Sequence, residues 1–270
     1  MKKRFVIATM ACAMLLAGCG NASESKNADN KTDSSVKTEA QENTKEKNTK
    51  EEYKKVELKI DKENKELVYT AFEDKEYGYN LPYINIDSED VKKINDEIAS
   101  IYVPIMEEQL NLGGSSVDLF SVEYNFYVND NILSLCIKDA WPNDQHNYDI
   151  YNVDINTGKR LDSKAIIAAK NKTESEFLGK VKEKCINDFL ERYGDRESNV
   201  NNYTNNADSE EEKEKRIKEY DDIWNKTNAD ENYTTDLPMY LDYNNNICVI
   251  ARVFSFAEQN GYDVVMKFDE

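Results

Sequence analysis

The segment from Asp139 to Tyr148 carries the side chains best suited to ligand recognition. Trp141 precedes a proline, and Asp144, His146 and Tyr148 follow it closely. An exposed indole could stack on a sugar or pack against a protein, while the carboxylate, imidazole and phenol supply hydrogen bonds. The alternative is a hairpin loop with the Trp141 ring folded back on the core. The sequence therefore marks Trp141, Asp144, His146 and Tyr148 as candidate ligand-binding residues and leaves both arrangements open.

These residue types form no recognisable catalytic or metal-binding motif. His146 is the only histidine, so a catalytic base would need a nucleophile and an orienting partner from elsewhere in the fold. Cys136, Cys185 and Cys248 are widely spaced, match no zinc pattern, and leave any pairing undecided. Residues 209–212 are Ser-Glu-Glu-Glu and lack the spacing of a calcium loop, which indicates a solvated helix start. We expect no catalytic residue, no metal ligand and no cofactor, although abundant acidic residues leave a glycosidase carboxylate pair open.

A further cysteine, Cys19, ends an N-terminal segment that is typical of secretion. Residues 2–4 are basic, and the apolar stretch over residues 5–16 is too short to span a bilayer. Leu16-Ala17-Gly18-Cys19 resembles a lipobox, which implies removal of residues 1–18 and diacylglycerol on the Cys19 sulfur. Two acyl chains are enough for stable anchoring. We expect an extracytoplasmic chain that is lipid-anchored to the cell membrane through Cys19.

Charge divides the mature chain into two parts. Residues 20–50 hold six Lys and six acidic residues among Asn, Ser and Thr, so residues 19–52 are expected to form a disordered tether. Residues 51–270 contain 26 basic and 47 acidic residues, a net charge of −21. That charge repels phosphate backbones, which disfavours nucleic acid, and attracts cationic proteins. The alternative is that it only keeps a surface protein soluble.

Apolar periodicity predicts the elements that must position the candidate residues. Strands are expected at 56–60, 67–72, 117–128, 132–140, 148–155, 239–243, 247–255 and 264–268. The first two strands are expected to form a hairpin, followed by an extended aromatic segment over 76–86. Helices are expected at 88–110, 174–193 and 210–225. Ser88 should cap the first helix, and Pro104 should kink or split it.

This order predicts an α+β domain over residues 53–270. Antiparallel β-sheet meanders would carry two to three packed helices. The length suits either one domain or two lobes that meet near residue 165.

Three segments resemble a bacterial extracytoplasmic domain. Residues 81–98 resemble its strand-to-helix opening, residues 151–161 its N-x-D-x-x-T-G-K strand and turn, and residues 254–262 its closing strand. The family is the DUF4163/DUF3298 region of lysozyme-sensing anti-sigma factors and peptidoglycan deacetylases. The resemblance implies the fold and is compatible with a lysozyme-like partner. It implies neither sigma-factor control nor deacetylation, because this chain has a lipobox in place of a spanning helix and only one histidine.

These patterns favour a membrane-anchored surface lipoprotein with a non-catalytic ligand-binding ectodomain. A cationic protein such as lysozyme is the expected partner, or else a wall glycan. The alternative is an envelope enzyme or a cell-wall glycan-binding module. Two close carboxylates in a deep pocket would favour the enzyme, and a flat aromatic strip would favour the glycan module.

Overall fold

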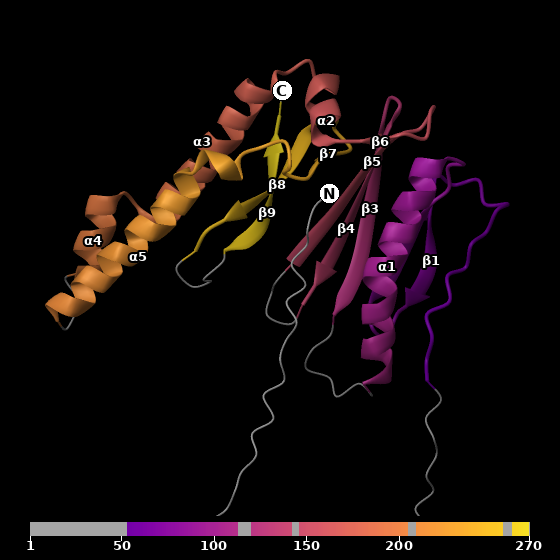
Figure 1. The fold of residues 1–270 in the computed structure, drawn as a ribbon, viewed down its shortest axis with the longest axis horizontal. Helices are drawn as coiled ribbons and strands as arrows, with labels where there is room; N and C mark the ends of the chain where they lie inside the picture. The colour runs from indigo at the N-terminus through magenta and orange to yellow at the C-terminus, as the bar shows by residue number, and fades with distance from the viewer. Residues whose placement is uncertain (1–52, 113–119, 142–145, 205–208, 256–260, 270) are drawn as a thin grey trace, which may run out of the picture. The chain divides into compact units, whose positions relative to one another are not determined.

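A computed structural model describes residues 53–112, 120–141, 146–204, 209–255 and 261–269 (Figure 1). Residues 51–270 group into one compact unit. Cys19, the expected signal peptide, the expected tether up to residue 52 and Asp144 lie outside the described residues.

The first sheet has six strands in the order β1-β2-β3-β4-β5-β6. They are β1 (Val68–Asp74), β2 (Tyr79–Ile84), β3 (Ser121–Asn129), β4 (Ile132–Ala140), β5 (His146–Asp154) and β6 (Arg160–Leu161). Neighbouring strands are antiparallel except β2 and β3, which are parallel and pair only at Tyr79↔Val122. The strands β3, β4 and β5 form the meander expected from their alternating residues.

The predicted hairpin between residues 56–60 and 67–72 is wrong. Residues 56–60 form no strand, although Lys59 N donates to Ala71 O at 2.8 Å, where β1 carries a bulge. The partner of β1 is β2, which comes from the aromatic segment and buries Tyr79, Leu81 and Ile84. More buried apolar surface therefore decides the pairing.

Helix α1 (Glu89–Asn111) packs against the first sheet. Ser88 is its N-cap and accepts from Val91 N at 3.0 Å, as predicted. Pro104 lies inside this helix, which is not split. Proline removes one helical hydrogen bond, and Tyr102 and Met106, both fully buried, hold the turns on either side of it against the core.

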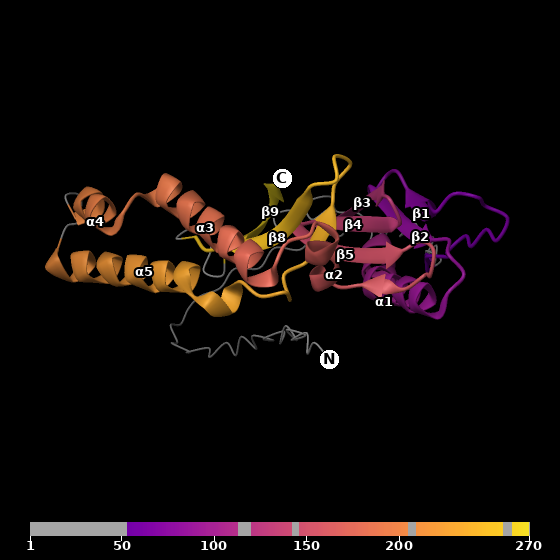
Figure 2. The same cartoon turned by 90° about the horizontal axis from the view of Figure 1, so that it is seen from above.

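The second half of the unit combines helices with a smaller sheet. Its elements are α2 (Ser163–Ala169), α3 (Glu174–Tyr193), α4 (Arg196–Thr204), α5 (Glu210–Asn228), η1 (Asp230–Asn232), β7 (Met239–Leu241), β8 (Ile247–Val253) and β9 (Tyr262–Phe268). The three strands form an antiparallel sheet in the order β7-β8-β9. In Figure 2, α3 and α5 lie side by side. Phe189 of α3 packs against Tyr220 and Trp224 of α5.

The two sheets share a buried layer. One face of β4 contributes Leu133, Leu135 and Ile137 to the core under α1. The other face contributes Cys136, which clusters with Cys248 and Tyr240 of the second sheet. Sheets with helices packed on them place the chain in the α+β class, as predicted.

Candidate functional site

The pairing of β4 with β5 separates the predicted ligand residues onto two faces. Asp139 is opposite Asn147, and Ala140 is opposite His146. Because side chains alternate along a strand, Asp139 and Asn147 lie on the face that carries α1, while His146 and Tyr148 lie on the other face. Tyr148 accordingly packs against the cluster between the sheets. Trp141 and His146 therefore do not form one site.

Trp141 is folded back on the core. Its ring lies 4.8 Å from the ring of Phe120, centroid to centroid, and it packs against the core under α1. Its Nε1 donates to Asp139 Oδ1 at 3.1 Å. Of the two arrangements left open by the sequence, the structure has the one in which the indole fixes the end of β4.

Two carboxylates lie on the α1 face near Trp141. Asp139 Oδ1 also accepts from the backbone and side-chain nitrogens of Asn147, at 3.3 and 2.8 Å. Burial raises the pKa of Asp139, although the hydrogen bonds from Asn147 oppose that shift. Asp149 Oδ2 accepts from the Tyr102 hydroxyl at 2.9 Å, and burial together with Asp149 raises the pKa of Tyr102 far above its usual range.

These carboxylates orient neighbouring groups. They occupy diagonal positions, since Ile137 is opposite Asp149 and Asp139 is opposite Asn147. The sequence does not single them out, because acidic residues are frequent throughout the chain. The spacing of Asp139, Asn147 and Asp149 on paired strands was the available signal.

The opposite face holds the His146 imidazole and the Cys136 thiol, with Cys248 packed against it, whereas Cys185 lies on α3 in a separate cluster. His146 Nδ1 is buried and has no hydrogen-bond partner among the described residues. A catalytic histidine needs an orienting partner. Burial raises the pKa of Cys136 to about 12 and that of Cys185 to about 11, so neither thiol is a ready nucleophile. Cys136, Cys185 and Cys248 are all free and buried.

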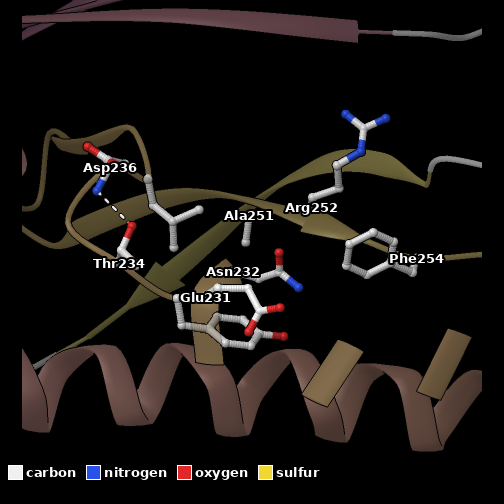
Figure 3. Close-up of a pocket in the computed structure, with 9 residues that line it drawn as sticks. Glu231, Asn232, Thr234, Asp236, Ala251, Arg252 and Phe254 are labelled. Carbon is white, nitrogen blue, oxygen red and sulfur yellow. Dashed lines mark hydrogen bonds between the residues drawn. The ribbon is translucent and has the colours of Figure 1, made fainter. Parts of the chain in front are cut away.

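A separate pocket of about 300 Å³ lies beside β8 (Figure 3). Its wall comes from η1, the following loop and β8: Glu231, Asn232, Tyr233, Thr234, Asp236, Leu237, Ala251, Arg252 and Phe254. Figure 3 shows Thr234 and Asp236 at one side and Phe254 at the other. The Arg252 guanidinium donates to Asp263 Oδ1 at 3.0 Å and Gly261 O at 2.7 Å.

This pocket suits binding better than nucleophilic chemistry. None of the wall residues is His, Cys or Ser. No sequence pattern marks the pocket, because its walls come from the end of the polar insertion and from β8, which are separated in the chain. Across the described residues, no group of three or more His, Cys, Asp or Glu side chains is placed to hold a metal ion.

Intramolecular ion pairs engage every arginine in the described part of the chain. The pairs are Arg160–Glu97 at 2.7 Å, Arg192–Asp188 at 2.9 Å, Arg196–Asp221 at 2.6 Å, Arg216–Glu212 at 2.5 Å and Arg252–Asp263 at 3.0 Å. Arginine is the side chain best suited to bind phosphate and carboxylate ligands, because its guanidinium group donates two parallel hydrogen bonds. These pairs engage the guanidinium groups that would otherwise bind anions, and the excess of 47 acidic over 26 basic residues in 51–270 favours cationic ligands.

Comparison with known proteins assigns no role to any residue of this chain. No protein-family model matches the chain, and no curated protein matches it. Within the described ranges, no helix has the length and apolarity needed to cross a membrane.

Proposed function

We propose that the chain is a membrane-anchored surface lipoprotein whose ectodomain, residues 53–270, binds a cationic protein such as a lysozyme. The observation that carries this proposal is the charge of −21 over residues 51–270, combined with ion pairing of all the described arginines. Such a surface attracts cationic proteins over long range and accelerates their association.

Binding is favoured over catalysis by the state of the reactive groups. The thiols are buried with raised pKa values, and Asp139 is committed to Trp141 and Asn147. Trp141 packs on Phe120, so it does not add to a flat aromatic strip for glycans. A protein ligand needs none of these groups to be reactive.

Binding can be tested with the soluble 51–270 fragment and a cationic lysozyme by calorimetry across a salt series. We expect binding at low ionic strength that weakens about tenfold or more towards physiological salt, because counter-ions screen surface charges. An acidic protein of similar size is the control and should not bind. Absence of lysozyme binding at low salt would refute the proposed partner class.

Membrane attachment is tested separately. The wild-type chain should incorporate labelled fatty acid and remain in the membrane fraction, because a thiol at position 19 is needed to carry the lipid. The Cys19→Ala variant should do neither. Equal labelling of the two proteins would show that Cys19 is not the anchor.

A further inference from the structure

Strand β3 is paired along its whole length on one side only. Its pairing with β4 runs without a break from Ser121↔Ala140 to Asn129↔Ile132. On its other side β2 pairs only at Tyr79↔Val122. Beyond Val122, most of this edge of β3 has no paired strand among the described residues.

The backbone groups that face this open edge can be identified. Val122 N donates to Gly78 O at 3.2 Å, so the backbone N–H of Val122 points towards β2. Along a strand, the backbone N–H and C=O groups of successive residues point alternately to one side of the strand and to the other. The N–H and C=O groups of Tyr124, Phe126 and Val128 therefore point to the same edge, and those of Tyr127 point to β4.

The same residues present an apolar row on one face. Phe126 is 41% exposed and Val128 is 44% exposed, both large for apolar side chains. Tyr124 stands next to them, with its hydroxyl 2.9 Å from Thr70 Oγ1. Proteins usually protect an exposed strand edge against pairing with another chain by a lysine, a proline or a β-bulge. β3 contains no lysine or proline, and its pairing with β4 has no bulge.

We infer that the edge formed by Tyr124, Phe126 and Val128 binds an extended segment of a cationic partner, which adds as a strand beside β3. The outward N–H and C=O groups of β3 form backbone hydrogen bonds with the added segment. The row formed by Phe126 and Val128 contacts alternate apolar side chains of that segment. The cationic character of this partner rests on the proposed function.

Charge and sequence pattern select this occupant over two others. A second copy would itself carry a net charge of −21 over residues 51–270, so the two copies would repel each other. Residues 20–52 of the same chain contain only Val36 as a large aliphatic residue, so they cannot supply alternating apolar side chains. A segment in which Lys or Arg alternates with apolar residues satisfies both charge and pattern.

The decisive variant is Val128→Pro in the 51–270 fragment. Proline removes the outward N–H of residue 128 and leaves the pairing of β3 with β4 intact, a position where edge strands tolerate it. The probe is a short labelled peptide in which Lys and Val alternate, measured by fluorescence anisotropy. We expect Val128→Pro to weaken its binding about tenfold. The matched control, Val128→Thr, keeps the N–H and should bind nearly as well as wild type.

Amide exchange of the wild-type fragment gives a second measurement that needs no variant. Peptide binding should slow exchange at the amides of Tyr124, Phe126 and Val128 and leave that of Tyr127 unchanged, because Tyr127 is already paired with β4. Unchanged exchange at all three outward amides, or equal peptide binding by Val128→Pro, would overturn the inference. Dimerisation of the fragment through this edge would also overturn it, since a second copy would then be the occupant.

The inference and the proposed function fail in different ways. If lysozyme binds wild type and Val128→Pro equally, the proposed function survives and the edge is not the docking site. If the peptide protects the edge while cationic proteins do not bind, the edge survives and the proposed function fails.

Discussion

Asp139 illustrates how a buried carboxylate can organise the end of a hairpin. Its Oδ1 atom accepts hydrogen bonds from Trp141 and Asn147, and its side chain is only 7% exposed. Burial disfavours the charged form and raises its pKa above the ordinary value of 3.8. The hydrogen bonds that fix the loop end are therefore made at the cost of burying a charge.

Replacement of Asp139 should change how stability depends on pH. A folded-state pKa above 3.8 means that folding favours the protonated carboxyl. The resulting contribution to the stability of the fold is complete below pH 3.8, the ordinary pKa, and is lost as pH rises through the folded pKa. Asn at position 139 does not titrate, so the stability of Asp139→Asn relative to wild type should increase as pH rises through this window. Urea unfolding across a pH series measures it.

Asp154 provides a control of opposite sign. The backbone N–H of Thr157, together with its hydroxyl, donates to Asp154 and lowers the pKa of that carboxyl. The stability that Asp154 contributes is therefore present above its ordinary pKa and is lost as pH falls through the folded pKa. Asp154→Asn should therefore lose stability relative to wild type as pH rises. If the stabilities of the two variants relative to wild type changed with pH in the same direction, the opposite pKa shifts of Asp139 and Asp154 would be contradicted.

Among the elements, the turn between β5 and β6 is coupled to the start of α1. Gly158 has a φ of +67°, and Ser88, the N-cap of α1, donates from Oγ to Gly158 O at 2.7 Å. A Cβ atom at Gly158 would collide with the Ser88 side chain. This glycine therefore permits both a left-handed backbone and close contact with the helix.

Gly158→Ala should destabilise the fold by at least about 2 kcal/mol, from left-handed strain and the collision with Ser88. Gly179→Ala is the matched control, because a Cβ at this position in α3 has no neighbour within 4 Å. The control should stabilise by about 0.5–1 kcal/mol through helix propensity. Urea midpoints compare the two, and similar losses in both would rule out the proposed contact.

Element boundaries were predictable where periodicity was long and continuous. β4 occupies Ile132–Ala140 and α3 occupies Glu174–Tyr193, as expected. The helices α2 and α4 were not predicted, since α2 has seven residues and α4 has a polar, Asn-rich sequence. The first hairpin was misassigned because local alternation does not reveal which apolar segment is the better partner.

The candidate site was harder to predict for a geometric reason. The sequence located the segment around Trp141, but the face of each side chain depends on strand register, and a shift of one residue reverses every face. Asp139 and His146 are seven residues apart in sequence and lie on opposite faces. No motif could have indicated that separation.

Across the whole molecule, a buried polar link joins the two sheets. Ser134 Oγ donates to Asn152 Oδ1 at 2.7 Å and accepts from Leu241 N at 3.1 Å. Asn152 Nδ2 then donates to Met239 O at 2.7 Å. Ser134 and Asn152 come from the first sheet, while Met239 and Leu241 belong to β7, so the link fixes how the sheets dock.

Ser134→Ala should cost about 1–3 kcal/mol, because Leu241 N and Asn152 Oδ1 would each lose a buried partner. Ser100→Ala is the control: its hydroxyl donates to Glu97 O on an exposed face of α1, and its effect should stay within about 0.5 kcal/mol. Chemical denaturation compares both variants with wild type. If Ser134→Ala left the free energy of unfolding unchanged, a water molecule would have to replace the hydroxyl as the hydrogen-bond partner.

The same link has a consequence for the order of folding. The β3–β4–β5 meander joins neighbours in sequence and closes short loops, so it can form early. Its polar residues Ser134 and Asn152 receive their β7 partners from 107 and 87 residues later in the chain. Until β7 docks, water must hydrate that face of the meander. Completion of the core therefore requires this long-range closure, and we expect it to be a slow step of folding.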